Sequence, residues 1–98
     1  MITLGFVPSQ SDAVTLDQPF TQNGLTYLSA YIFPAGAGDI VWENNQGEPQ
    51  WFPNAAAGQG YILGAKRILT NATVNGTPRT TTATNMTWVS INQVYNTP

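Results

Sequence analysis

The acidic residues have the clearest potential for chemistry, because the chain contains neither histidine nor cysteine. The segment GDIVWENNQGEPQWFP, residues 38–53, holds Asp39, Glu43 and Glu48 together with two of the three tryptophans. A general acid and base for glycoside hydrolysis need carboxylates about 5–9.5 Å apart. On a strand, Asp39 and Glu43 share a face but lie roughly 13 Å apart, since each residue adds about 3.3 Å.

Glu43 and Glu48 could meet across a turn at 44–50, but a solvated hairpin tip is the more ordinary arrangement of two such acids. Without histidine or cysteine, Ser-His-Asp and Cys-His catalysis have no base, and transition metals have no good ligands. The acids do not follow the spacing of an EF-hand loop. We therefore expect no enzyme activity, no metal and no cofactor.

The tryptophans suggest both a core and a possible contact surface. Trp42 alternates with Ile40, and Trp88 lies in an apolar run, so both are expected in the core. Trp51 lies between two prolines in EPQWFPN. Two alternatives stay open for Trp51: it packs beneath a loop, or it is exposed as a stacking surface for a sugar or a protein.

The chain is weakly charged, with three basic residues, five acidic residues and a formal net charge of −2. A nucleic-acid binder needs a stripe of Lys and Arg that displaces counterions from phosphates. The basic residues here are only the pair Lys66-Arg67 and the isolated Arg79, so no nucleic-acid partner is expected. Lys66-Arg67 could instead contact an acidic partner, or guard a strand edge against pairing.

Nothing in the sequence indicates a membrane partner. No stretch approaches the roughly 18 apolar residues of a membrane span. The first residues, MITLGFVPSQSDAV, lack the basic and apolar regions of a signal peptide. The absence of cysteine loosely favours synthesis in a reducing cytoplasm.

The elements that position these side chains are predicted to be strands, because apolar residues recur with a period of two. Longer strands are expected over 25–33, 38–44, 65–74 and 86–95, with a short edge strand over 2–8. Asn23-Gly24 and Asn75-Gly76 are hairpin signals. The strand 25–33 is apolar on both faces, as expected of a strand buried on both sides. The one helix candidate, 54–60, contains two glycines that limit it to about a turn.

These patterns predict one all-β domain over residues 1–98, a small sandwich or jelly-roll-like barrel of about six to eight short strands. A chain of 98 residues holds a modest core, so association is an attractive way to cover leftover apolar surface. Two polar, β-prone segments, within 1–24 and over 74–85, are either arms that add a strand to another sheet or ordinary surface loops.

Residues 28–90 contain a series of turn and strand features: Gly38-Asp39, a hairpin around Gly47, Phe52-Pro53 leading to Ala57-Gly58, Lys66-Arg67 with Ile68-Leu69, and TATNMTWVS. In these features the chain resembles small β-rich virion proteins of tailed bacteriophages, including head-decoration and spike-base proteins. The resemblance implies a structural protein that binds a capsid or a spike as a symmetric oligomer, without catalysis.

The expected function is therefore that of a phage decoration or cement protein, a homotrimer by family analogy, made in the host cytoplasm and located in the virion. Its expected partner is the major capsid protein or another virion protein. Contacts are expected from the arms and from Trp51, Lys66, Arg67 and Arg79. The alternative is a carbohydrate-binding module or receptor-binding fibre tip. In it, sugar rings would stack on Trp51 and Trp42 and make polar contacts with Asn44, Asn45, Gln46 and Glu48.

Overall fold

The computed structural model describes residues 12–22 and 24–90, and all regular elements within them are β-strands. The strands are β1 (Asp12–Ala13), β2 (Phe20–Gln22), β3 (Leu25–Tyr27), β4 (Ser29–Phe33), β5 (Gly38–Glu43), β6 (Pro49–Ala55), β7 (Tyr61–Gly64), β8 (Arg67–Leu69), β9 (Asn71–Val74), β10 (Thr77–Thr80) and β11 (Thr87–Ser90). The all-β prediction is confirmed. Eleven strands in the described residues exceed the six to eight expected, because two predicted strands are divided and β1, β2 and β7 lie where no strand was predicted.

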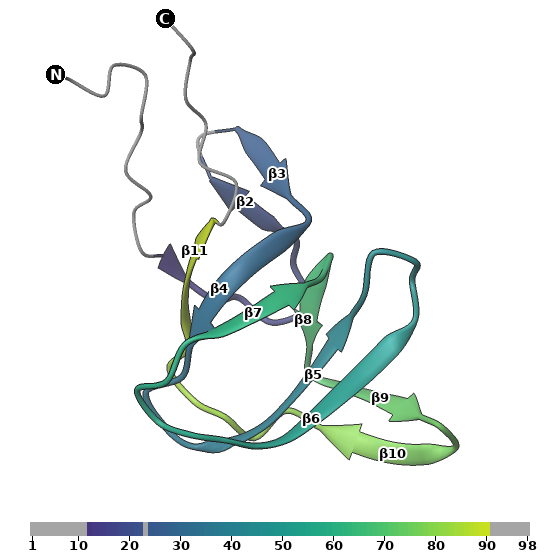
Figure 1. Cartoon of the computed structure of the whole chain (residues 1–98). Helices are drawn as coiled ribbons and strands as arrows, with labels where there is room; N and C mark the ends of the chain where they lie inside the picture. The colour runs from purple at the N-terminus through teal and green to yellow at the C-terminus, as the bar shows by residue number, and fades with distance from the viewer. Residues whose placement is uncertain (1–11, 23, 91–98) are drawn as a thin grey trace, which may run out of the picture.

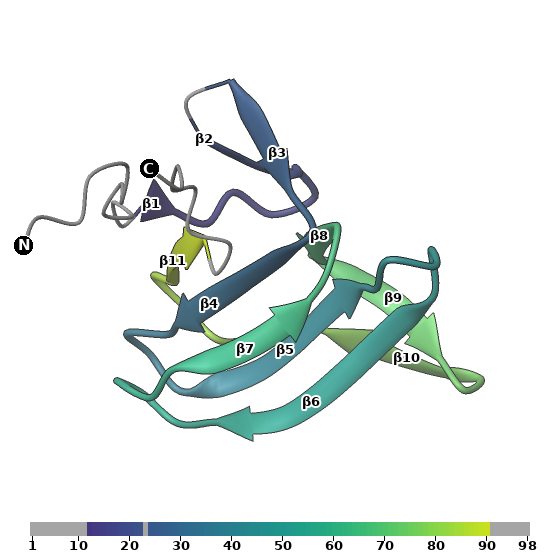
Figure 2. The same cartoon turned by 45° about the horizontal axis from the view of Figure 1, so that its top comes forward.

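Two antiparallel sheets form the body of the protein (Figure 1). The first has the order β1-β11-β4-β7 and the second the order β6-β5-β8, while β2–β3 and β9–β10 are separate two-stranded hairpins. Figure 2 shows β4 and β7 lying over β5 and β6. The core lies between the two sheets and includes Ala30, Ile32, Leu63 and Trp88 from the first and Ile40, Ala55 and Ile68 from the second. This arrangement is a small sandwich.

Two expected strands are interrupted. The stretch 25–33 divides at Leu28 into β3, which pairs with β2, and β4, which pairs with β11 and β7. The stretch 65–74 divides at Thr70 into β8, which pairs with β5, and β9, which pairs with β10. The prediction of continuous strands was wrong because a period of two shows which residues share a face but not where a strand changes partner.

Other expectations concern turns and the remaining segments. Asn75 and Gly76 have φ angles of 51° and 82° and join β9 to β10, as expected of a two-residue hairpin. The helix candidate over 54–60 does not form a helix, since β6 runs through Ala55 and a turn follows. The expected strand over 2–8 and the end of 86–95 lie outside the described residues. Within those residues the structure holds no helix long and apolar enough to cross a membrane.

The described part of the first expected arm lies against the body of the protein. β1 pairs with β11, and the backbone N–H of Val14 donates to the carbonyl of Met86 (2.9 Å). Phe20 is buried in the core, with its ring centroid 5.1 Å from that of Trp88. The β2–β3 hairpin at the end of this segment extends away from the body (Figure 1). Residues 12–22 are therefore tied to both sheets and the core.

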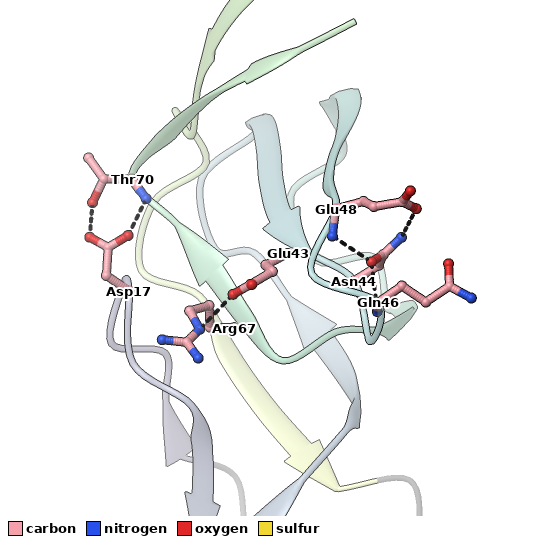
Figure 3. Close-up of polar contacts among 7 residues, drawn as sticks. All are labelled: Asp17, Glu43, Asn44, Gln46, Glu48, Arg67 and Thr70. Atoms are coloured by element: carbon pink, nitrogen blue, oxygen red, sulfur yellow. Dashed lines mark hydrogen bonds and ion pairs between the residues drawn. The ribbon is translucent and has the colours of Figure 1, made fainter.

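Asp17 fastens this segment to the corner between β8 and β9 (Figure 3). Its carboxylate accepts hydrogen bonds from the Thr70 hydroxyl (2.5 Å) and the Thr70 backbone N–H (2.9 Å). Its own N–H donates to the Ile68 carbonyl (2.6 Å). The hydroxyl bond first, and then the backbone bond, lower the pKa of the Asp17 carboxyl below its ordinary value of 3.8.

The Asp17 contact predicts a pH dependence of stability. Because its pKa is lower in the folded state, the carboxylate stabilises the fold above the unfolded-state pKa of about 3.8, and this contribution is lost as the pH falls through the folded-state pKa. We expect Asp17→Asn to lower the melting temperature slightly at neutral pH and to match the wild type well below pH 3.8. Thermal melts of both proteins across this range test the prediction. A difference that persists unchanged into acid would contradict it.

Candidate protein-binding face

The second sheet has an outer face that points away from the core. The strand register aligns Trp51, Val41 and Leu69 across β6, β5 and β8. The neighbouring row on β5 and β8 pairs Glu43 with Arg67. Alternate residues of a strand share a face, and the intervening residues on the other face, Ile40 and Ile68, belong to the core. Trp51 and Arg67 therefore lie on the same face, which we call the outer face of the second sheet.

The β9–β10 hairpin covers part of this outer face. The guanidinium carbon of Arg79 lies 3.6 Å from the centroid of the Trp51 ring. Val41, which is opposite Trp51 on the neighbouring strand, and Val74 on the hairpin are both buried but do not belong to the main core. A cation over an indole ring contributes about 0.5–2 kcal/mol, depending on its exposure. Arg79 therefore acts as a clamp between the hairpin and the sheet.

The clamp is made by stacking rather than by hydrogen bonds. The Trp51 Nε1 and the Arg79 Nε are both buried and have no hydrogen-bond acceptor among the described residues. Trp51 as a whole is half-buried. The Arg79 guanidinium therefore occupies one face of the ring, while part of Trp51 stays exposed.

The chain that follows β10 runs beside β5 and is held there by threonines. The Thr81 hydroxyl accepts from the backbone N–H of Val41 (2.9 Å) and lies 2.6 Å from the Leu69 carbonyl, to which it donates. The Thr82 hydroxyl accepts from the N–H of Asp39 (2.8 Å), and the N–H of Thr82 donates to the Asp39 carbonyl (2.9 Å). The threonine run thus continues the attachment of residues 74–85 to the sheet.

The charged residues of the outer face are paired with each other (Figure 3). Arg67 Nε lies 2.9 Å from Glu43 Oε1, with side chains 37% and 26% exposed. The same Nε has no well-directed hydrogen bond, so the contact is an ion pair without hydrogen-bond geometry. Partly exposed pairs of this kind contribute little to stability. Lys66 is half-buried at the corner before β8, where its backbone N–H donates to the Glu43 carbonyl (2.8 Å).

The acids considered for catalysis do not come together. Glu43 pairs with Arg67, while Glu48 lies exposed at the hairpin tip and accepts from the Asn44 amide (3.2 Å; Figure 3). Asn44 Oδ1 accepts from the backbone N–H groups of Gln46 and Glu48, each at 2.9 Å. Asp39 accepts from the backbone N–H of Asn54 (3.0 Å). In residues 12–22 and 24–90, no cluster of three or more acids forms a candidate metal site.

The structure therefore brings three of the four expected contact residues to one side of the second sheet. Trp51, Arg67 and Arg79 gather there, and Lys66 lies beside them at the corner before β8. Trp42 and Trp88 pack in or against the core as expected.

Sequence reasoning missed a second surface, the outer face of the first sheet. The strand over 25–33 was expected to be buried on both faces, but Tyr31 on β4 is 38% exposed and its neighbour on β7, Ile62, is 67% exposed. The expectation was wrong because this side of β4 is only partly covered, with Ser29 and Phe33 half-buried and Tyr31 exposed. The signal available in the sequence was the apolar content of both faces of SAYIF and of YILG.

Comparisons of the chain with protein-family models, with curated proteins and with solved structures find no match.

Proposed function

We propose that the chain is a structural virion protein of a tailed phage, which binds and stabilises the capsid surface without catalysis. The observation that carries this proposal is the β9–β10 hairpin, which extends from the body (Figures 1 and 2) and is clamped at its base by Arg79 on Trp51. In this proposal the hairpin contacts the major capsid protein or another virion protein. Nucleic acid and membrane take no part in the interaction.

The hairpin is suited to contact with another protein. Its exposed residues are uncharged and include Asn71, Thr73, Pro78 and Thr80. Contact residues of this kind can be desolvated at lower cost than charged groups. The clamp and the threonine hydrogen bonds order the segment before it binds, so less conformational entropy is lost on association.

A shell protein of this kind would act by mass action. A ligand that binds only the assembled state stabilises that state in proportion to its affinity and concentration. Many copies on a repeating lattice add their contributions, and linked copies gain further through effective concentration. The resemblance to decoration and spike-base proteins supports this proposal, and the same resemblance assigns the protein to the virion after synthesis in the host cytoplasm.

Sedimentation with shells assembled from the major capsid protein of the same phage tests the proposal. We expect wild-type protein to sediment with the shells and Thr73→Glu to lose about tenfold or more in retention, because a carboxylate would be buried without a partner. The matched control is Thr26→Glu, which places the same charge at an exposed position of the β2–β3 hairpin. Wild-type protein that remains in the supernatant would overturn the capsid assignment.

A further inference from the structure

The edge strands of the two larger sheets differ in their protection against pairing. Exposed edges are commonly guarded by charge, by proline or by extreme shortness. β1 carries Asp12, β8 carries Arg67, and β6 carries Pro49 and Pro53. β7, with the sequence YILG, has no charge and no proline, and β4 is its one strand partner in the described chain. β7 is therefore the unguarded edge.

An apolar row on the outer face of the first sheet ends at this edge. The register aligns Val89, Tyr31 and Ile62 across β11, β4 and β7. Tyr31 also stacks on Phe33, with ring centroids 4.7 Å apart. No charged residue occurs in β4 (SAYIF), β7 (YILG) or β11 (TWVS). An exposed apolar row on a sheet that ends in an open edge is the arrangement used in strand addition.

The placement of the Tyr31 and Phe33 rings requires a glycine at position 60. A Cβ atom on Gly60 would lie 2.2 Å from Cε1 of Tyr31 and 2.8 Å from Cε1 of Phe33. Gly60 therefore lets both rings lie against the chain just before β7, which keeps the apolar surface continuous with the edge strand.

We propose that β7 pairs antiparallel with β7 of a second copy about a two-fold axis, which joins the two four-stranded sheets into one. Such a contact brings each residue close to its own counterpart, so a charge in the strand would face a like charge. YILG satisfies this condition, and the described edges β1 and β8 do not.

The pleat restricts the register of this pairing, and a register centred on Ile62 is compatible with it. Directly opposed residues of an antiparallel pair point to the same face, and a shift by one residue exchanges the faces. Ile62 points outward and Leu63 belongs to the core. Both copies keep their cores on one side of the joined sheet when Ile62 lies opposite Ile62 of the second copy. Tyr61 then lies opposite Leu63, and the two apolar rows meet at the axis.

This pairing gives two copies rather than the three that family analogy favours. A closed ring of three needs a heterologous contact between β7 and a different surface. The other three edges of the two larger sheets carry charge or proline. The inference is independent of the proposed function, since a failure to pair would leave the hairpin surface and its capsid test unchanged.

Light scattering on a size-exclusion column tests this inference with the full-length chain. We expect a mass of twice 10.6 kDa for the wild type and a single 10.6 kDa for Ile62→Lys, in which two ammonium groups would meet at the axis. Ile62 is 67% exposed, so this variant should keep its fold, and a circular dichroism melt verifies that. The matched control is Leu25→Lys, which changes a leucine of 50% exposure on the β2–β3 hairpin and should remain a dimer.

Hydrogen exchange provides the second measurement. Amides of 61–64 should exchange more slowly as the concentration of wild-type protein rises, and this dependence should vanish in Ile62→Lys. A wild-type monomer, a wild-type trimer, or an Ile62→Lys dimer would each overturn the inference.

Discussion

The Gly38→Ala variant is expected to lose about 3 kcal/mol of unfolding free energy, since overpacking alone costs typically 1–3 kcal/mol and backbone hydrogen bonds are lost as well. An added Cβ would lie 2.4 Å from the backbone nitrogen of Ala83 and 2.6 Å from the carbonyl carbon of Thr82. These are backbone atoms, so the clash can be relieved only if the chain at 82–83 moves away from β5.

That movement would break the attachment beside Asp39. The Asp39 carbonyl accepts from the N–H groups of Thr82 (2.9 Å) and Ala83 (3.1 Å), and the Asp39 N–H donates to the Thr82 hydroxyl (2.8 Å). Each such bond contributes about 1 kcal/mol. A domain of this size has a total stability of about 5–15 kcal/mol, and its melting temperature falls by roughly 4–8 °C for each kcal/mol lost.

Urea unfolding of Gly38→Ala beside Gly64→Ala tests this prediction. A Cβ on Gly64 would meet only Asn45 Nδ2, at an ordinary 3.6 Å, so the control should be neutral or slightly stabilising, because glycine weakens a strand interior. Equal unfolding free energies for the two variants would contradict the close approach at Gly38.

Local patterns in the sequence predicted the all-β class, the Asn75-Gly76 turn and the inward direction of Trp88. Each of these follows from a few neighbouring residues, either through face alternation or through the left-handed φ angles that a tight hairpin requires. The same local reading could not locate the strand breaks at Leu28 and Thr70. A break depends on which distant strand lies alongside, and alternation is the same on both sides of it.

The candidate binding face was predictable only in part. Trp51, Arg67 and Arg79 were singled out individually for their side chains, but their gathering on one side depends on the register of β6, β5 and β8 and on the folding back of the β9–β10 hairpin. Pairing between elements distant in sequence is set by tertiary packing, which propensity does not contain. The reading of GDIVWENNQGEPQWFP as two strands with an exposed turn is confirmed.

Family resemblance and strand geometry lead to different assemblies. Analogy favours three copies, and the unguarded edge of β7 favours two. The β9–β10 hairpin is separate from the four-stranded sheet that contains β7. The hairpin is therefore free to bind a shell while β7 binds a second copy. A two-fold pair would carry two hairpins, and binding of the second hairpin would become intramolecular.

Trp51→Ala is expected to release the β9–β10 hairpin from the sheet while leaving the main core intact. The substitution removes the ring beneath Arg79 and the cross-strand neighbour of the buried Val41. Truncation of a fully buried tryptophan to alanine costs about 3–5 kcal/mol. Since Trp51 is half-buried, we expect a loss of about 2 kcal/mol in unfolding free energy, together with faster amide exchange over 71–80. Trp88 is 3% exposed in the core, and its near-ultraviolet circular dichroism should persist.

Arg79→Lys is the matched variant for the stacking contact, because an ammonium keeps the charge but cannot stack as a plane on the indole. It should loosen the hairpin less than Trp51→Ala does. A double-mutant cycle of Trp51→Ala with Arg79→Ala should give a favourable coupling within the range of about 0.5–3 kcal/mol measured for contacting pairs. Additive effects would mean that the two side chains do not act together.

The Trp51→Ala variant also distinguishes capsid binding from carbohydrate binding. In the capsid proposal, Trp51→Ala reduces shell retention because the hairpin is no longer ordered in advance, so retention and amide protection over 71–80 fall together. In the carbohydrate alternative, wild-type protein binds a glycan array and Trp51→Ala abolishes that binding. One face of the Trp51 ring is already occupied by Arg79, so a sugar would have to displace the guanidinium or use the other face. Glycan binding by the wild type that is lost in Trp51→Ala would replace the capsid proposal with a lectin.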